Sequence, residues 1–223
     1  MNFDHHSVAY SEQITEALAL VGLEHGFFFE AKVREILAAR RDLPAGRLRV
    51  LEIGCGVGLL QQRLRPLLGR VWGIDSSVGS LALAGASKGT LAAADGMRAP
   101  FADESFDLVI AVCVLHHVPV EQRDAFLAES MRVTRRGGVL ALCEHNPWNP
   151  LTRAVVGRCE FDHDAVLLTR AELRRRLREV GLGAIETRYI LFFPWRGSFW
   201  RRLERLLAWI PFGGQYFIRA TRV

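Results

Sequence analysis

The residues best placed for chemistry form a glycine loop, Glu52-Ile53-Gly54-Cys55-Gly56-Val57-Gly58, directly after an apolar run. Glycines at alternate positions let the backbone turn sharply off a strand, and they let a ligand approach main-chain atoms without an intervening Cβ. A dinucleotide site instead has the spacing Gly-x-Gly-x-x-Gly, and its pyrophosphate favours a helix start without acidic residues. The loop therefore predicts a ligand site of another kind.

Two carboxylates mark the ends of the next two expected strands. Asp75 lies 21 residues after Gly54, where a carboxylate can accept hydrogen bonds from both hydroxyls of a ribose. Asp95, followed by Gly96, ends the third strand, where it could accept from the exocyclic amine of an adenine. The apolar residues available to contact that ring are Val71, Ile74 and Met97. Each acid alone is more often a helix cap or loop residue, but three marked strand ends in order favour an adenosine-like ligand.

Three histidines are candidates for a general base. His116 and His117 follow the fourth expected strand, and His145 ends the fifth with Glu144 beside it. An imidazole with a pKa near neutrality can remove a proton from a hydroxyl. One of two adjacent residues at such a strand end usually packs into the sheet–helix junction, and the segment 146–150 after His145 also fits a capped turn.

A second group of chemically capable side chains, Cys159-Glu160-Phe161-Asp162-His163-Asp164, lies in an expected loop. No zinc-ligand spacing fits it, so a solvated loop or lid is favoured and no metal site is predicted. The four cysteines lie far apart without a Cys-x-x-Cys pair, and we expect them to be reduced.

These side chains need a scaffold that brings strand ends together, and the chain alternates strand and helix patterns. The expected strands are 48–53, 70–74, 90–94, 106–112, 137–143, 185–193 and 215–221. The expected helices are 8–23, 30–40, 59–68, 78–86, 121–134, 170–180 and 199–210, with Gly22 and Gly26 breaking the first two. Such alternation predicts a parallel sheet covered on both faces, with ligands bound at the carboxyl ends of its strands.

Composition predicts one globular domain over the 223 residues: a helical lead-in (1–46), a ligand-binding core (47–144) and a C-terminal part (145–223). No apolar run reaches the roughly 18 residues that span a bilayer, and the N-terminus lacks the apolar core of a signal peptide. A cytoplasmic protein is therefore expected. The net charge of +5 arises in residues 145–223, where 14 basic residues outnumber 7 acidic ones.

Taken in order, these stretches resemble the class I S-adenosylmethionine-dependent methyltransferases, in particular the ubiquinone and menaquinone methyltransferase-like group. The matching stretches are Leu51 to Gly58, Gly73-Ile74-Asp75-Ser76-Ser77, Ala94-Asp95-Gly96 before Pro100-Phe101, Phe106 to Val109 leading to Leu115-His116-His117-Val118, and Arg136-Gly137-Gly138. The resemblance implies a Rossmann-like, doubly wound α/β sheet of seven strands. It would be mostly parallel, with an antiparallel strand near the C-terminus and helices on both faces.

The resemblance also implies roles for residues at matching positions, with S-adenosyl-L-methionine as cofactor. The cofactor-binding residues would be Tyr10, Glu52, Gly54, Cys55, Gly56, Gly58, Asp75, Ser76, Asp95, Gly96 and Val112. Glu52 and Asp75 would place negative charge near the sulfonium and the amino group. His116, His117 and His145 remain the candidate catalytic residues. The methyl acceptor would be a small or lipid-like molecule, with O- or C-methylation left open.

The C-terminal part combines aromatic residues with arginines. Phe192-Phe193-Pro194-Trp195 and Phe199-Trp200 are interleaved with Arg196, Arg201, Arg202 and Arg205. Packing of this helix inside the molecule or in a homodimer is favoured, and peripheral contact of residues 192–210 with an anionic membrane is the alternative. No nucleic-acid-binding module is recognisable. The alternative to a methyltransferase is a family member that binds the cofactor without transferring a methyl group.

Overall fold

The computed structural model describes residues 25–44, 46–84, 90–159 and 162–223. Its strands are β1 (Val50–Ile53), β2 (Val71–Asp75), β3 (Leu91–Ala93), β4 (Phe106–Val112), β5 (Thr134–His145), β6 (Leu182–Ile190) and β7 (Gln215–Arg222). Its α-helices are α2 (His25–Ala39), α3 (Leu59–Leu68), α4 (Val78–Ala82), α5 (Arg123–Val133), α6 (Pro150–Val156), α7 (Arg170–Glu179) and α8 (Ser198–Leu207). The 3₁₀ turns η2 (Arg40–Asp42) and η4 (Val120–Gln122) follow α2 and precede α5.

The seven strands form one sheet in the order β3-β2-β1-β4-β5-β7-β6. The first five are parallel, and β7 runs antiparallel between β5 and β6. β1 and β4 are neighbours although two other strands separate them in the sequence, so the direction of winding reverses between them. The prediction of a doubly wound, mostly parallel seven-stranded sheet is confirmed.

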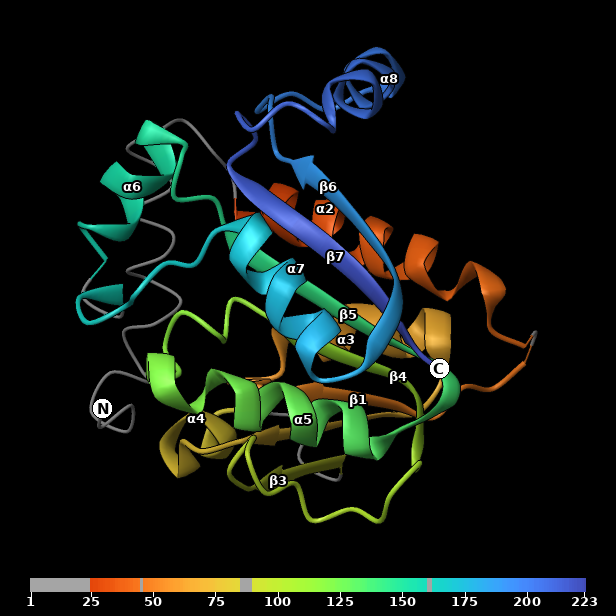
Figure 1. Cartoon of the computed structure of the whole chain (residues 1–223). Coiled ribbons are helices and arrows are strands. Elements are labelled where there is room, and N and C mark those ends of the chain that lie inside the picture. The colour runs from red at the N-terminus through yellow and green to blue at the C-terminus, as the bar shows by residue number, and fades with distance from the viewer. Residues whose placement is uncertain (1–24, 45, 85–89, 160–161) are drawn as a thin grey trace.

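Helices cover both faces of this sheet, which makes a three-layer molecule (Figure 1). On one face, α2 and α3 pack Ile36, Ala39 and Leu64 against the central strands. On the other face, α5 and α7 supply Phe126 and Leu173 to a second core cluster. β1 and β4 are buried on both sides, which explains why they read as continuous apolar runs and not as alternating ones.

The predicted elements differ from the structure in several places, including the bounds of β6, which begins and ends three residues earlier than predicted. Gly26 lies inside the first turn of α2, so it does not break that helix. The short helix α6 was not predicted: Asn149 caps its start by accepting from Thr152 N at 2.9 Å, with Pro150 at its first position. β5 begins at Thr134 because α5 ends one residue earlier. The predicted helix 8–23 lies outside the described residues.

Candidate functional site

The glycine loop leaves β1 through three residues in the left-handed region. Gly54, Gly56 and Gly58 have φ angles of 73°, 52° and 76°. A Cβ on Gly54 would lie 2.5 Å from Val114 Cγ2, whereas a Cβ on Gly56 would meet nothing within 4 Å. Packing therefore requires Gly54 to lack a side chain, while Gly56 leaves open space in which a ligand can reach the backbone.

Asp75 closes the loop from the end of β2. Its Oδ2 accepts a hydrogen bond from Gly56 N at 2.7 Å, and its Oδ1 accepts from Ser77 N at 2.8 Å. Each carboxylate oxygen has two acceptor sites, so one on each oxygen is left for a further donor. At the end of β3, Asp95 similarly accepts from Met97 N at 2.8 Å and keeps acceptor capacity. Both carboxylates are thus oriented by backbone groups before any ligand arrives.

A cavity of about 430 Å³ opens at the carboxyl ends of β1, β2 and β4. The predicted cofactor residues that line it are Gly54, Gly56, Asp75, Ser76, Asp95, Gly96 and Val112. Ile74 and Met97, proposed as ring contacts, line it as well. Val71, the third such residue, does not line it, because it begins β2 at the opposite end and is buried in the α2–α3 core.

Three of the other predicted cofactor residues do not line the cavity, and the fourth, Tyr10, is not among the described residues. Cys55 is buried, and its sulfur packs against Gly73, where an added Cβ would lie 2.8 Å from it. Gly58 caps α3 and is not part of the cavity wall. Glu52 is also buried, and its Oε2 has no hydrogen-bond partner among the described residues. Burial and the charge of Asp75 raise the pKa of Glu52 well above its usual range.

Two of the three candidate histidines lie beside acidic groups, His116 buried and His117 half-buried. His116 Nδ1 lies 2.6 Å from Oε2 of the fully buried Glu144, whose Oε1 accepts from Val114 N and Leu115 N at 3.0 and 2.8 Å. Burial lowers the pKa of His116, but the charge of Glu144 and hydrogen bonding outweigh it and raise that pKa to about 10. Burial and the neighbouring His116 lower the pKa of His117 to about 4. Only His117 lines the cavity.

The third histidine belongs to a cluster around Cys113, which follows β4 and lines the cavity. Gln215 Nε2 lies 3.3 Å and Lys32 Nζ 3.6 Å from Cys113 Sγ, and Gln215 Nε2 lies 3.4 Å from His145 Nδ1. Burial raises the pKa of the Cys113 thiol, but Lys32 and His145 outweigh it and lower the pKa to about 7. His145 itself does not line the cavity, so its described neighbour there is this thiol.

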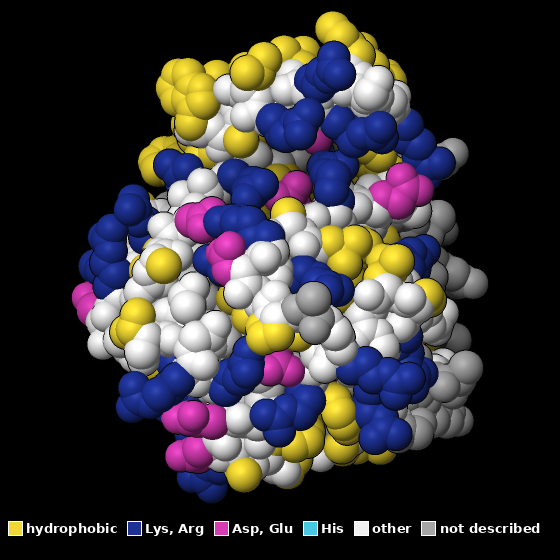
Figure 2. All heavy atoms as spheres, turned by 90° about the vertical axis from the view of Figure 1, so that its right-hand side faces the viewer, with side chains coloured by type: hydrophobic (Ala, Val, Ile, Leu, Met, Phe, Trp, Pro, Cys, Tyr) yellow, Lys and Arg dark blue, Asp and Glu magenta, His cyan; other side chains and the backbone are white. Residues whose placement is uncertain are grey.

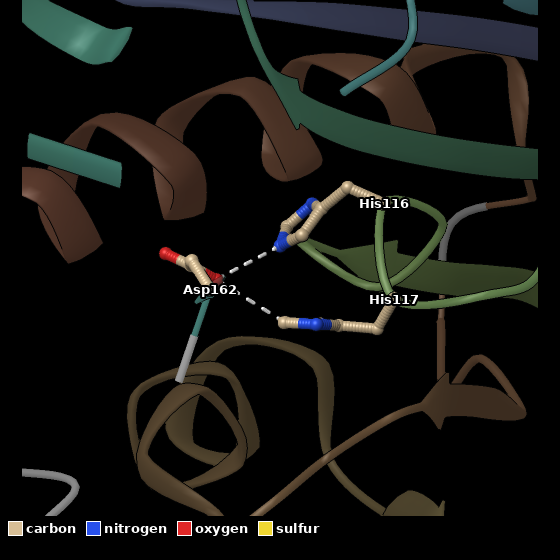
Figure 3. A group of neighbouring side chains, drawn as sticks. All are labelled: His116, His117 and Asp162. Carbon is tan, nitrogen blue, oxygen red and sulfur yellow. Dashed lines mark ion pairs between the residues drawn. The ribbon is translucent and has the colours of Figure 1, made fainter. Parts of the chain in front are cut away.

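Cys113 lies in the segment from Val112 to His116 that the resemblance places beside the sulfonium, but two other residues of this region were not predicted. No sequence pattern marks Lys32 as a site residue, because only the fold brings α2 to the end of β4. Asp162 was assigned to a solvated loop, yet its Oδ1 lies 3.4 Å from His116 Nε2 and 3.3 Å from His117 Nε2. Figure 3 shows both rings directed at this carboxylate.

Known proteins resemble this chain in sequence and fold. Residues 51–142 match the family model of a methyltransferase domain. A demethylmenaquinone methyltransferase from Parafrankia sp. is 34% identical over 171 residues, which cover 66% of this chain and 64% of the relative. Another from Thermobifida fusca is 35% identical over 129 residues, which cover 54% and 53%. The chain therefore spans less than two thirds of these relatives.

A solved structure extends the likeness to the whole fold. The structure is that of an S-adenosylmethionine-dependent methyltransferase from Thermotoga maritima, described as a possible histamine N-methyltransferase. It superposes with a TM-score of 0.72 at 21% identity, and the match covers 99% of this chain and 98% of the other. At that identity the likeness concerns the fold alone.

Proposed function

Because this chain belongs to the class I S-adenosylmethionine-dependent methyltransferases, we propose that it transfers a methyl group to a small or lipid-like acceptor. One observation carries the proposal: open backbone at Gly56, the carboxylate of Asp75 and that of Asp95 all line one cavity. Their order from β1 to β3 matches the amino acid, ribose and adenine parts of the cofactor.

The described residues fit this cofactor chemically. Asp75 and Asp95 keep acceptor sites for the ribose hydroxyls and the adenine amine, and Ile74 and Met97 offer apolar surface to the ring. Glu52 has a buried oxygen without a hydrogen-bond partner among the described residues, but it does not line the cavity, so we assign it no contact with the cofactor. When bound, S-adenosylmethionine supplies a methyl group on a positively charged sulfonium.

The chain contributes to catalysis mainly by positioning the acceptor and secondly by removing a proton from it. Methyl transfer depends mainly on holding the acceptor in line with the methyl group, which the cavity walls beyond β4 would do. For a hydroxyl acceptor, His117 is the histidine within reach, and its pKa of about 4 leaves it neutral at pH 7 and able to take a proton. The Cys113 thiolate is the second candidate base, with a pKa nearer neutrality.

For the acceptor we propose a reduced quinone or a related phenol with an apolar tail. The names of the two relatives supply the ring chemistry, since both are demethylmenaquinone methyltransferases. The wall beyond β4 suits an aromatic ring, because Val118, Pro119 and Phe126 line it. Whether the methyl group goes to carbon or oxygen depends on which atom of the ring lies in line.

The test is the release of S-adenosylhomocysteine when reduced quinones and phenols are supplied to the purified chain. Turnover with a quinol, with the methylated product identified by mass spectrometry, is expected and also separates C- from O-methylation. Tight binding of S-adenosylhomocysteine without turnover on any acceptor would favour the alternative, a non-methylating member. No binding of the cofactor at all would refute the site assignment.

We further propose that α8 contacts an anionic membrane and so gives access to a lipid-like acceptor. No residue of α8 is buried, and Phe199, Leu206 and, just after the helix, Trp209 are 66%, 71% and 73% exposed. Figure 2 shows hydrophobic side chains gathered at the top of the molecule, where Figure 1 places α8, with Lys and Arg side chains beside them. Exposed aromatic and aliphatic residues flanked by arginine are typical of helices that lie in a lipid interface.

Internal packing accounts for one part of α8: the ring of Trp200 lies 5.0 Å from Phe193 and 4.4 Å from Trp195 between centroids, and Glu204 fixes the same region. This carboxylate accepts from Phe192 N at 3.0 Å and lies 3.3 Å from Arg34 of α2. No helix in the described part of the chain is long and apolar enough to cross a membrane.

Co-sedimentation with vesicles tests the membrane proposal. The parent should bind vesicles rich in phosphatidylglycerol more strongly than those of phosphatidylcholine alone. Changing Arg201, Arg202 and Arg205 to Glu should release it, whereas the matched control, Arg174, Arg175 and Arg178 of α7 changed to Glu, should still bind. No vesicle binding by the parent, with a dimer seen by ultracentrifugation, would favour a homodimer contact instead.

A further inference from the structure

His116, His117 and Asp162 lie together beside the cavity, and no cofactor role has been assigned to them as a set. Each offers one ligand atom, and the three atoms all lie within 4.8 Å of one another. His116 and His117 follow β4, and Asp162 comes from the loop after α6, so only the fold unites them (Figure 3). We propose that they bind one divalent transition-metal ion, with Zn²⁺ as the best fit.

The distances suit a metal better than a direct hydrogen bond. Asp162 Oδ1 lies 3.4 Å from His116 Nε2 and 3.3 Å from His117 Nε2. Hydrogen bonds between an imidazolium and a carboxylate are usually about 2.7–2.9 Å long. Two ligand atoms held about 2.0–2.1 Å from a tetrahedral zinc ion lie about 3.3 Å apart. The two distances to Asp162 are therefore those of neighbouring ligands around one ion, and the two imidazole nitrogens lie within 4.8 Å of each other.

The surroundings of His116 are those of a metal-binding imidazole. Its side chain is 1% exposed, and its Nε2 has no hydrogen-bond partner among the described residues. The opposite nitrogen, Nδ1, lies 2.6 Å from Glu144, which is itself held by two backbone amides. A carboxylate on one ring nitrogen fixes the tautomer and turns the lone pair of the other toward a metal. Glu144 orients His116 in this way.

The three ligands leave a coordination position open. His117 is both a proposed ligand and part of the cavity wall, so a fourth ligand would enter from the cavity. Two imidazoles and one carboxylate are the donors that borderline metals such as Zn²⁺ accept, whereas Mg²⁺ and Ca²⁺ prefer oxygen alone. If the proposed methyl transfer holds, the open position would take a hydroxyl oxygen of the acceptor, and Cys113 would be the base because His117 is then a ligand. The metal site itself does not depend on that function.

Metal binding tests the proposal without any methyl acceptor. The full chain, stripped with a chelator, is titrated with Co²⁺ while its visible absorption is followed, and Zn²⁺ affinity is measured by competition with a chromophoric chelator. We expect one equivalent of metal, with the intense bands of four-coordinate Co²⁺. Asp162→Asn and His117→Gln should each weaken binding by more than the ~10–100-fold typical of losing an outer partner.

Neighbouring residues of the same loop provide matched controls. Asp164→Asn and His163→Gln remove a carboxylate and an imidazole that are 70% and 86% exposed, and they should bind metal like the parent. Thermal unfolding shows that each variant is folded. Equal metal affinity in all four variants, or no bound metal in the parent, would overturn the site. Failure of methyl transfer alone would count only against the proposed function.

Discussion

Replacing Gly56 by Ala should weaken cofactor binding and lower stability, whereas Gly137→Ala should lower stability alone. Gly56 and Gly137 have left-handed φ angles of 52° and 71°, and a Cβ on either would meet nothing within 4 Å. Gly137 lies in β5 and does not line the cavity. Left-handed backbone costs a residue with a Cβ about 1–2 kcal/mol, so both variants should lose that stability. In a domain of this size, the melting temperature then falls by about 2–8 °C.

Only Gly56→Ala should also lose affinity, because its new methyl group occupies the space where the ligand meets the backbone. Overpacking of this kind costs about 1–3 kcal/mol, which weakens binding about 5- to 150-fold. Calorimetry with S-adenosylhomocysteine measures the affinity, and calorimetric unfolding measures the stability. If Gly56→Ala and Gly137→Ala bind the ligand equally well, the loop is not the cofactor site and the reasoning fails.

Two further predictions concern the cavity wall. Asp75→Asn should bind S-adenosylmethionine about 10- to 150-fold more weakly, since hydrogen bonds to a charged group contribute about 1.5–3 kcal/mol. Asp103→Asn, outside the cavity, should bind like the parent, and unchanged affinity in both would exclude the ribose role. The lowered pKa of Cys113 means that its thiolate forms as pH rises through about 7. Iodoacetamide labelling at Cys113, mapped by mass spectrometry, should follow that curve; labelling only above pH 8.5 would contradict it.

Local sequence pattern predicted an element correctly where a single physical constraint, such as burial or backbone conformation, determined its residues. The β4 run Phe106–Val112 coincides with its predicted strand because both of its faces are buried, so every position had to be apolar. The loop from Gly54 to Gly58 was recognisable because its left-handed backbone excludes most other residues. Element boundaries were less certain: Gly26 lies in α2, where packing against the sheet outweighs the weak helix propensity of glycine.

The prediction of no metal site considered only spacing along the chain. It rested on ligands within residues 159–164, where no zinc pattern occurs. In the fold, Asp162 from that loop meets His116 and His117 from the far end of β4. Metal ligands that come from distant segments show no fixed spacing in the sequence, because the segments belong to different helices, strands or loops.

The sequence by itself determined the class of fold and the position of the ligand-binding edge. Strands alternating with helices can bury their apolar faces only as a covered parallel sheet, and the carboxyl ends of its strands then meet at one edge. Only the tertiary structure decided which side chains act together there. The contacts of Lys32 and Gln215 with Cys113, and of Glu144 with His116, join segments far apart in the chain. Charge and burial at such contacts depend on distance in space, which spacing along the chain does not encode.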